Sequence, residues 1–271
     1  MSEKSISVII STYNSKEWLK KVMIGYNQQT LQNFEMVIAD DGSRQDTKDM
    51  IEAFPANYPI THVWHEDNGF QKSQILNKAI LACNTDYIIM SDGDCIPRKD
   101  FIAVHEKYRE PGCFLSGGYY KLTMPISEKI DEELIKNQTC FNLNWLLQNG
   151  LKKTFKNNKL NSFGKKATFL NWITPTKATW NGHNASGWKK DILAVNGFDE
   201  RMQYGGQDRE LGERLINLGI KSKQIRYSAI VIHLDHPRGY MNKESWEINN
   251  NIRRNTRSKN VNFTPFGIKK D

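Results

Sequence analysis

The sequence has no apolar run of the roughly 18 to 20 residues that a membrane-spanning helix needs. Its N-terminus enters a strand-like stretch at once, without the pattern of a secretory signal peptide. Its four cysteines are scattered, with no close pair at metal-binding spacing and none of the density of a disulfide scaffold. We therefore expect reduced thiols and a cytoplasmic location.

Signatures of dinucleotide binding, of a Gly-rich phosphate loop and of nucleic-acid binding are missing as well. No Gly-x-Gly-x-x-Gly follows the first apolar run, which argues against a dinucleotide oxidoreductase and against a nucleotidyltransferase with a Gly-rich phosphate loop. No zinc-finger spacing or aromatic RNA-binding signature accompanies the basic residues, so we expect no nucleic-acid partner. The net charge of +8 still favours an anionic partner, and a nucleotide-sugar and an acidic membrane surface both fit it.

What the first part of the chain does contain is a repeated pattern of a short β-branched apolar run, a turn and an amphipathic helix. Strands are expected over residues 5–11, 34–39, 60–64 and 87–90, and helices over residues 16–29, 43–54 and 70–82. Ser43 and Asp46 offer a capping-box start for the second of these helices. Strands that alternate with helices predict an α/β, Rossmann-like fold, with a mostly parallel sheet and helices on both faces.

The regular alternation stops after residue 118. One helix is expected over residues 126–148, and the polar, basic residues 152–166 predict a surface loop. A helix over residues 207–218, a strand over residues 228–233 and, from residue 243, a helix with a loose basic tail complete the chain. The helix over 126–148 and the tail could together make a peripheral contact with an anionic membrane at the inner face of the plasma membrane, and the alternative is a buried helix with a solvated tail.

Polar loops follow the ends of the four expected strands. Because the carboxyl ends of parallel strands meet at one edge of a sheet, where ligands bind, these loops should form a single site. The residues concerned are Ser11, Thr12, Tyr13 and Asn14 after the first strand, Asp40 and Asp41 after the second, Asn68 and Gly69 after the third, and Asp92, Gly93 and Asp94 after the fourth.

The motif Asp92-Gly93-Asp94 is the first candidate for chemistry. Two carboxylates at the end of a buried strand suffer desolvation and mutual repulsion unless a cation neutralises them. Mn²⁺ or Mg²⁺ suits such an oxygen-rich setting and would bridge to a diphosphate. The alternative is a solvated Asp-Gly turn, which the position of the motif after the fourth strand makes less favourable.

Two further side chains have both a binding and a structural interpretation. Asp41 could accept a hydrogen bond from a nucleobase N–H and so select uracil, while Ser43 caps the following helix. His233, at the end of an apolar strand, could complete a metal shell or could simply be a hydrogen-bonded histidine.

A second acidic cluster opens the helix expected at residue 207. Gly205 and Gly206 would let a ligand approach the backbone closely, and Asp208 in the first helical turn is a plausible general base for an incoming hydroxyl. The alternative is that Asp208 and Glu210 only complement the helix dipole.

Together these motifs resemble family 2 glycosyltransferases of the GT-A fold. The resemblance rests on residues 8–14, on residues 28–30, on residues 37–43, and on Asp92-Gly93-Asp94 with Pro97. Residues 196–200 and 204–208 resemble the acceptor-side motif of the subgroup that includes bacterial chondroitin-type polymerases and animal galactosyltransferases. The resemblance covers about residues 5–233, and residues 124–179 have no match in it.

The resemblance implies roles for several residues. Ser11 and Asp41 would contact the base, and Asp92 would contact the ribose or the donor sugar. Asp94 would bind the metal, with His233 as the family's late metal ligand. Asp208 matches the carboxylate that deprotonates the acceptor. We add Lys72 to the donor-binding residues, and we place Gly205, Gly206, Gln207 and Trp188 with the acceptor-binding ones.

The sequence departs from the family pattern at two positions. Gln207 stands where the family commonly has Glu, which removes a charge beside Asp208, and Gln71 stands where related sequences often carry Arg. Both changes lie next to residues with an expected role in binding.

The resemblance also implies an activity and a domain organisation. The activity is metal-dependent, inverting transfer of a sugar from a nucleotide-sugar, with UDP as the expected nucleotide, to a glycan or lipid-linked glycan acceptor in bacterial surface polysaccharide or lipopolysaccharide synthesis. Residues 1–242 would form the GT-A domain, with a nucleotide-sugar half over about 1–123, a helical insertion over about 124–179 and an acceptor half over about 180–242, followed by a basic tail over 243–271. A nucleotidyltransferase acting on sugar phosphates and a noncatalytic sugar-binding module remain as alternatives.

Overall fold

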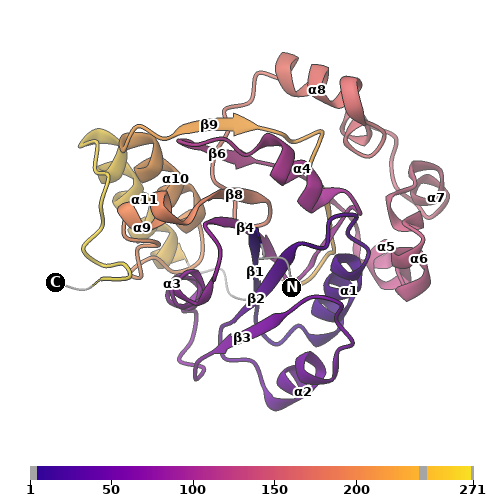
Figure 1. Ribbon diagram of the computed structural model, residues 1–271, viewed down its shortest axis with the longest axis horizontal. Coiled ribbons are helices and arrows are strands. Elements are labelled where there is room, and N and C mark those ends of the chain that lie inside the picture. The colour runs from indigo at the N-terminus through magenta and orange to yellow at the C-terminus, as the bar shows by residue number, and fades with distance from the viewer. Residues whose placement is uncertain (1–4, 238–242, 270–271) are drawn as a thin grey trace.

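The computed structural model describes residues 5–237 and 243–269, and it has the mixed α/β architecture that the sequence predicts (Figure 1). Its main sheet has seven strands in the order β3-β2-β1-β4-β8-β6-β9. Their bounds are β3 (Ile60–Trp64), β2 (Phe34–Asp40), β1 (Ile6–Thr12), β4 (Tyr87–Asp92), β8 (Ala185–Trp188), β6 (Cys113–Ser116) and β9 (Lys221–Gln224). The first four strands in this order are parallel, whereas β8 runs antiparallel to both of its neighbours.

Helices cover both faces of the main sheet, as predicted. Alternate side chains of β1 point to opposite faces. Ile10 belongs to a core cluster with the buried face of α1 (Lys16–Asn27), and Ile9 belongs to another cluster with α3 (Lys72–Ala82) and α10 (Gln207–Asn217). All seven residues of β1 are buried, which explains why this strand is an almost continuous apolar run.

A second sheet of three strands lies beside the carboxyl end of β4. Its order is β5-β10-β7, with bounds β5 (Cys95–Pro97), β10 (Ile230–His233) and β7 (Gly118–Lys121). β10 pairs antiparallel with β5 and parallel with β7, so that His233 lies opposite both Cys95 and Lys121. This pairing places the end of β10, and with it His233, next to the acidic motif that follows β4.

The single helix expected over residues 126–148 is wrong. The segment folds as α5 (Met124–Lys129), α6 (Glu132–Lys136), the 3-10 turn η1 (Thr139–Phe141) and α7 (Leu143–Gln148). Asp131 and Asn142 cap new helices with their side chains, and Gln138 has a left-handed backbone, with φ of 62°. Asx side chains that bond to the backbone compete with helix continuation, so the apolar pattern is divided among short pieces. Ile126, Ile135 and Leu146 are buried and belong to the hydrophobic core.

Two neighbouring predictions need smaller corrections. Residues 152–166 are not only loop, because they contain η2 (Phe155–Lys159) and the start of α8 (Gly164–Ile173). The helix α2 (Gln45–Ala53) starts without a side-chain cap, because Ser43 instead accepts a hydrogen bond from the backbone N–H of Asn14. The remaining helices are α4 (Phe101–Tyr108) and α9 (Lys189–Ala194).

The C-terminal tail is not loose over its described residues. After α11 (Lys243–Ser258), which packs on α10, the chain returns to the loop that follows α9. Thr264 donates a hydrogen bond from its side chain to Asp199, and the side-chain amide of Asn196 donates to the carbonyl of Thr264. Residues 243–269 therefore pack against the α/β domain. No described helix combines the length and the apolar character that a membrane span would require.

Candidate active site

A cavity of about 850 Å³ opens at the carboxyl ends of β1 and β4, between the main sheet, the three-stranded sheet and the loop before α10. The structure brings most of the expected site residues together around it. These are Ser11, Thr12, Tyr13, Asn14, Asp41, Gly69, Lys72, Asp92, Gly93, Asp94, Gly205, Gly206, Gln207, Asp208 and His233.

Three expected site residues, Asp40, Asn68 and Trp188, do not line the cavity. Asp40 is fully buried. Its carboxylate accepts a hydrogen bond from the N–H of Ser43 and lies 2.9 Å from Nε2 of His62, so it stabilises the loop that contains Asp41. Asn68 is exposed outside the cavity.

Trp188 lies at the wrong edge of the sheet for an acceptor contact. β8 runs antiparallel to β4, so its last residue, Trp188, pairs with Tyr87 at the start of β4, whereas the cavity is at the end of that strand. Its indole N–H donates to the carbonyl of Glu110, and its ring packs edge-on against Tyr87. The assignment of Trp188 to the acceptor is therefore wrong.

Asp41 forms part of the cavity wall and is held from two sides. One carboxylate oxygen lies 2.7 Å from Nε2 of His65, and the other accepts a hydrogen bond of 3.0 Å from the backbone N–H of Gln71. Burial raises the pKa of Asp41, and the contacts with His65 and Gln71 offset only part of that rise. Position 71 thus contributes its backbone to this contact, whichever side chain it carries.

Lys72, the first residue of α3, stands among the acidic groups of the cavity. Its Nζ lies 2.7 Å from Oδ1 of Asp92, which also accepts a hydrogen bond from the hydroxyl of Ser11. Burial opposes both charges, but the attraction between them outweighs it: the pKa of Asp92 is held well below its usual value and the pKa of Lys72 is raised. Both side chains are therefore ionised near neutral pH.

Asp208 sits in the first turn of α10, close enough to Lys72 for the two charges to interact. Burial raises its pKa, and the nearby charge of Lys72 opposes that rise. Gly205 and Gly206 precede it with φ of 107° and 89°, which are left-handed values that glycine adopts without strain. A Cβ on Gly182 would lie 2.8 Å from Oδ1 of Asp208, so the absence of a side chain there leaves room for this carboxylate.

Glu210 serves the fold and does not face the cavity. It is buried and forms an ion pair of 2.8 Å with Arg214, and it also accepts a hydrogen bond from Thr256 of α11. Its neighbour Arg214 donates in turn to the carbonyls of Val195 and Gly197. Asp208 and Glu210, which the sequence analysis grouped in one acidic cluster, therefore differ: Asp208 lines the cavity, whereas Glu210 is paired with Arg214 in the interior.

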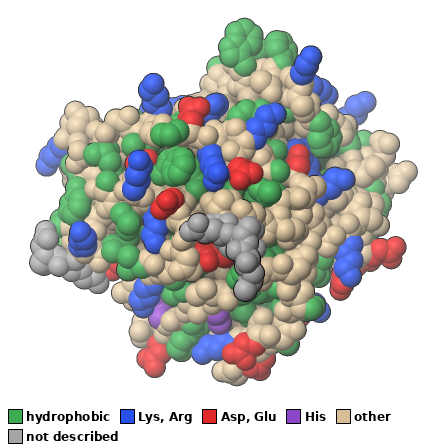
Figure 2. Space-filling view, in the orientation of Figure 1, with side chains coloured by type: hydrophobic (Ala, Val, Ile, Leu, Met, Phe, Trp, Pro, Cys, Tyr) green, Lys and Arg blue, Asp and Glu red, His purple; other side chains and the backbone are tan. Residues whose placement is uncertain are grey.

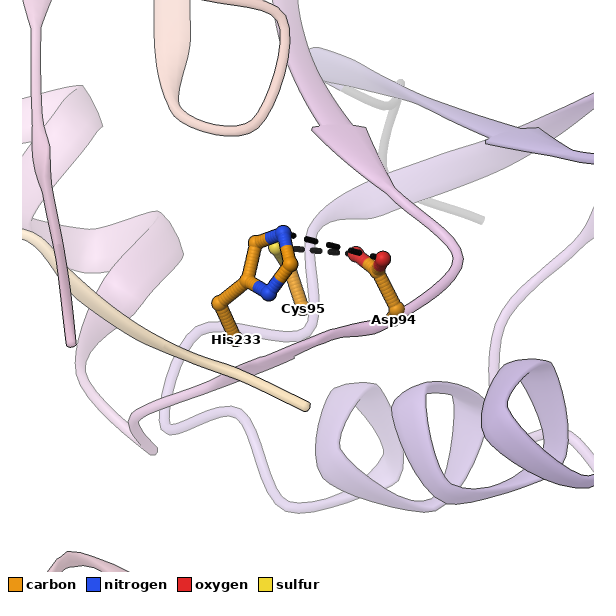
Figure 3. A group of neighbouring side chains, drawn as sticks. All are labelled: Asp94, Cys95 and His233. Carbon is orange, nitrogen blue, oxygen red and sulfur yellow. Dashed lines mark hydrogen bonds and ion pairs between the residues drawn. The ribbon is translucent and has the colours of Figure 1, made fainter. Parts of the chain in front are cut away.

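Asp94, Cys95 and His233 form a group whose ligand atoms all lie within 4.8 Å of one another (Figure 3). Nε2 of His233 is 3.7 Å from Oδ2 of Asp94, and Nε2 of His236 is 3.1 Å from the same oxygen. Nδ1 of His233 is buried without a hydrogen-bond partner. A carboxylate with imidazole nitrogens fits a divalent cation such as Mn²⁺. The thiol of Cys95 is a poorer ligand, because burial raises its pKa and keeps it protonated.

Several residues of the cavity were not among the expected site residues, including Tyr119, Lys121, His183 and His236. Tyr119 and Lys121 belong to β7, and Tyr119 packs its ring against His183 at a centroid distance of 4.3 Å. Burial lowers the pKa of His183 to about 4, so this imidazole is neutral at pH 7. The sequence carries a signal only for His236, three residues after His233.

Solved structures with the same architecture define the class of this fold. A mannosyltransferase from Pyrobaculum calidifontis, in complex with GDP-Man and Mn²⁺, aligns with a TM-score of 0.58 at 18% identity, over 89% of this chain and 59% of its own. Residues 1–349 of TarS from S. aureus, in complex with UDP-GlcNAc, align with a TM-score of 0.58 at 14% identity, over 87% of this chain and 60% of their own. The fold is that of a GT-A glycosyltransferase.

Sequence comparison adds the family. Residues 7–115 match the model of glycosyl transferase family 2. The uncharacterized glycosyltransferase YfnE of Bacillus subtilis is 30% identical over 85% of this chain and 65% of its own length. The hyaluronan synthase of Pasteurella multocida is 28% identical over 91% of this chain, and the chondroitin synthase of Escherichia coli is 24% identical over 86%.

The chain is similar to family 2 glycosyltransferases and resembles the chondroitin-type polymerases. It spans just under two thirds of YfnE, about a quarter of the hyaluronan synthase and about a third of the chondroitin synthase.

Proposed function

We propose that this protein transfers a sugar from a nucleotide-sugar, with UDP as its nucleotide, to a hydroxyl of a glycan or lipid-linked glycan, with inversion at the anomeric carbon. The observation that carries the proposal is the grouping of Lys72, Asp92 and Asp208 in one cavity with the Asp94 and His233 pair. Such a cavity combines anchoring groups for a diphosphate donor with a separate carboxylate that can accept a proton.

The donor would lie along the ends of β1 and β4. Asp41, fixed by His65 and the N–H of Gln71, would accept a hydrogen bond from the N–H of uracil. Asp92, kept ionised by Lys72, would accept hydrogen bonds from hydroxyls of the ribose or the donor sugar. Ser11 holds Asp92 in place from the adjacent strand.

Asp94 and His233, with His236 beside them, would hold Mn²⁺ or Mg²⁺. When bound, such an ion stabilises the negative charge that develops on the departing diphosphate. Asp94 directly precedes β5 and His233 ends β10, so the pairing of these two strands fixes the positions of both side chains.

Asp208 would act as the general base. As the acceptor oxygen attacks the anomeric carbon, its proton passes to Asp208, the new C–O bond forms, and the bond to the β-phosphate oxygen breaks with its electron pair going to the nucleoside diphosphate. One displacement of this kind inverts the anomeric configuration. The raised pKa of Asp208 makes this carboxylate a stronger base than an exposed one.

Within this proposal, different parts of the chain bind the donor and the acceptor. Residues 1–123 would bind the nucleotide-sugar and residues 180–242 would supply the acceptor side, with the insertion of residues 124–179 between them. Surface polysaccharide or lipopolysaccharide synthesis is the setting that we propose for the reaction, since relatives named as hyaluronan and chondroitin synthases make polysaccharides.

A panel of UDP-sugars and GDP-sugars, each incubated with and without Mn²⁺, tests the proposal. We expect release of UDP from at least one UDP-sugar that depends on Mn²⁺ and is faster with a suitable acceptor. Release of pyrophosphate from UTP and a sugar phosphate would instead identify a nucleotidyltransferase. Binding of UDP-sugars without any turnover on an acceptor panel would favour a noncatalytic sugar-binding module.

A further inference from the structure

The insertion carries an exposed aromatic surface that the proposed reaction does not use. Trp172 is 81% exposed and Phe155 is 71% exposed, and about half of the surface of Phe163, Phe169 and Ile173 is open to solvent. Single exposed apolar residues are common on soluble proteins, but several large ones within one short segment of the chain, two of them in ring contact, mark an interaction surface. We call these five residues the α8 surface.

The outward face of α8 is apolar where the outward face of a helix is usually polar. Ala167 and Leu170 point inward and pack with Tyr227. Phe169, Trp172 and Ile173 point outward, and the rings of Phe169 and Trp172 are neighbours at a centroid distance of 6.2 Å. The inward residues fasten the helix to the domain, so the outward rings form a surface on a fixed support.

The surroundings of the α8 surface are strongly basic. No Asp or Glu occurs in the sequence between Glu133 and Asp191, whereas ten lysines do. Five of the six lysines within residues 152–166 are exposed, among them Lys165 and Lys166 in the first turn of α8. Figure 2 shows hydrophobic side chains at the top of the molecule, in the region of α8, with Lys and Arg side chains near them. Burial is the main cause that lowers the pKa of Lys159 to about 8, and the charges of Arg226 and Lys156 lower it further.

We propose that the α8 surface docks the protein on an anionic lipid bilayer. Trp and Phe side chains favour the boundary between headgroups and acyl chains, and lysines beside them bind anionic headgroups, because their long stems let the charge reach the interface. Apolar rings surrounded by lysines, with no carboxylate on the same stretch of chain, match both requirements. This inference does not depend on the transfer reaction.

Vesicle co-sedimentation tests the docking. The full chain is mixed with vesicles of phosphatidylcholine alone, or of phosphatidylcholine with phosphatidylglycerol, without metal or nucleotide. We expect binding to the anionic vesicles that is at least about tenfold tighter than to the neutral ones and that weakens with salt. Equal binding to both kinds of vesicle, or binding to neither, would overturn the proposal.

Paired variants assign the binding to the α8 surface. We expect Phe169→Ser with Trp172→Ser, and separately Lys165→Glu with Lys166→Glu, each to weaken anionic vesicle binding at least about tenfold. The matched controls Phe263→Ser and Lys20→Glu alter an exposed aromatic and an exposed lysine elsewhere, and should bind like the unaltered protein. Thermal unfolding of each variant shows whether it is folded. Equal loss in variants and controls would contradict the assignment.

Fluorescence provides a second measurement that does not rely on lost binding. Trp172→Phe keeps an apolar ring at the position, so it should still bind anionic vesicles. The unaltered protein should show a blue shift of tryptophan emission on binding, and the Trp172→Phe variant should show a smaller one. An identical shift in both proteins would place another surface against the lipid.

Self-association that Trp172→Ser abolishes, without vesicle binding, would make the α8 surface a contact between copies of the chain and would also overturn the proposal.

Discussion

Nζ of Lys72 lies 2.7 Å from Oδ1 of Asp92, and this ion pair joins the start of α3 to the end of β4. Ser11 donates to the same carboxylate oxygen from the end of β1. Lys72 also feels the charges of Asp208 and Asp94, so it is the cation that balances the acidic groups of the cavity before any ligand enters. This relationship links the stability of the protein to its proposed donor site.

Lys72→Met should therefore destabilise the protein. Its loss leaves Asp92 without its cation, and we expect the free energy of unfolding to fall by about 1.5–3 kcal/mol at pH 7, the range for hydrogen bonds to charged groups. The depressed pKa of Asp92 contributes stability that is present above the pKa of an unfolded Asp, about 3.9, and is lost as the pH falls toward the folded value. The difference between the two proteins should thus shrink below about pH 4.

Urea denaturation at pH 7 and at pH 3.5 measures this difference. Lys136→Met is the matched control, because Lys136 pairs with Glu132 on the exposed surface. Its denaturation midpoint should stay close to that of the unaltered protein at both pH values. A Lys72→Met protein as stable as the control would show that the ion pair does not stabilise the fold.

Asp208→Asn should separate donor binding from transfer. The amide keeps the shape of the side chain but cannot take the acceptor proton, so transfer should fall by at least roughly 10²-fold while Mn²⁺-dependent UDP binding is retained. Because burial raises the pKa of Asp208, the transfer rate of the unaltered enzyme should decline on acidification with an apparent pKa above the ordinary Asp value. Near-normal transfer by Asp208→Asn would remove Asp208 from the role of base.

Glu210→Gln should act on stability and much less on the proposed chemistry. Arg214 is fully buried, and the change leaves its charge without a carboxylate, which costs about 3–5 kcal/mol when one partner of a buried pair is removed. We expect a lower thermal unfolding temperature, and a transfer rate per folded molecule that stays near normal. A normal unfolding temperature with abolished transfer would instead assign the base to Glu210.

Asp94→Ala and His233→Ala should each weaken Mn²⁺-dependent UDP binding at least roughly tenfold, since each removes a proposed metal ligand. Calorimetric titration with UDP, with Mn²⁺ and with a chelator, measures the metal-dependent part. Cys95→Ala is the comparison, because its protonated thiol contributes little to binding a hard cation. If UDP binds to both ligand variants as it does to the unaltered protein, the metal lies elsewhere.

The sequence predicted the parallel half of the fold well because its signals are local. β1 and β2 are mostly apolar strands of seven residues that are buried along their whole length, and such strands between amphipathic helices are typical of the centre of a parallel sheet. The loops after these strands fall at one edge of the sheet as a consequence of topology. That reasoning correctly grouped Ser11, Asp41, Asp92 and Asp94 around one cavity.

The insertion was predicted poorly because its apolar spacing suggested one helix. Asp131 and Asn142 fit a helix interior badly but do not forbid it, and only their bonds to the backbone ended one helix and began the next. The aromatic residues of α8 had no periodic pattern long enough to stand out, so the sequence did not reveal that they face outward.

By itself, then, the sequence determined the parallel strands, their acidic loops and the resemblance to family 2 glycosyltransferases, since each depends on residues close together in the chain. The tertiary structure alone decided which of two neighbouring acids faces the cavity: Glu210 turns inward to Arg214 and Asp208 does not. It also decided that Trp188 lies at the far edge, through the direction of β8, and that His233 meets Asp94, through the pairing of β10 with β5. Contacts between residues more than a hundred positions apart depend on how buried surfaces pack, which no local pattern of residues encodes.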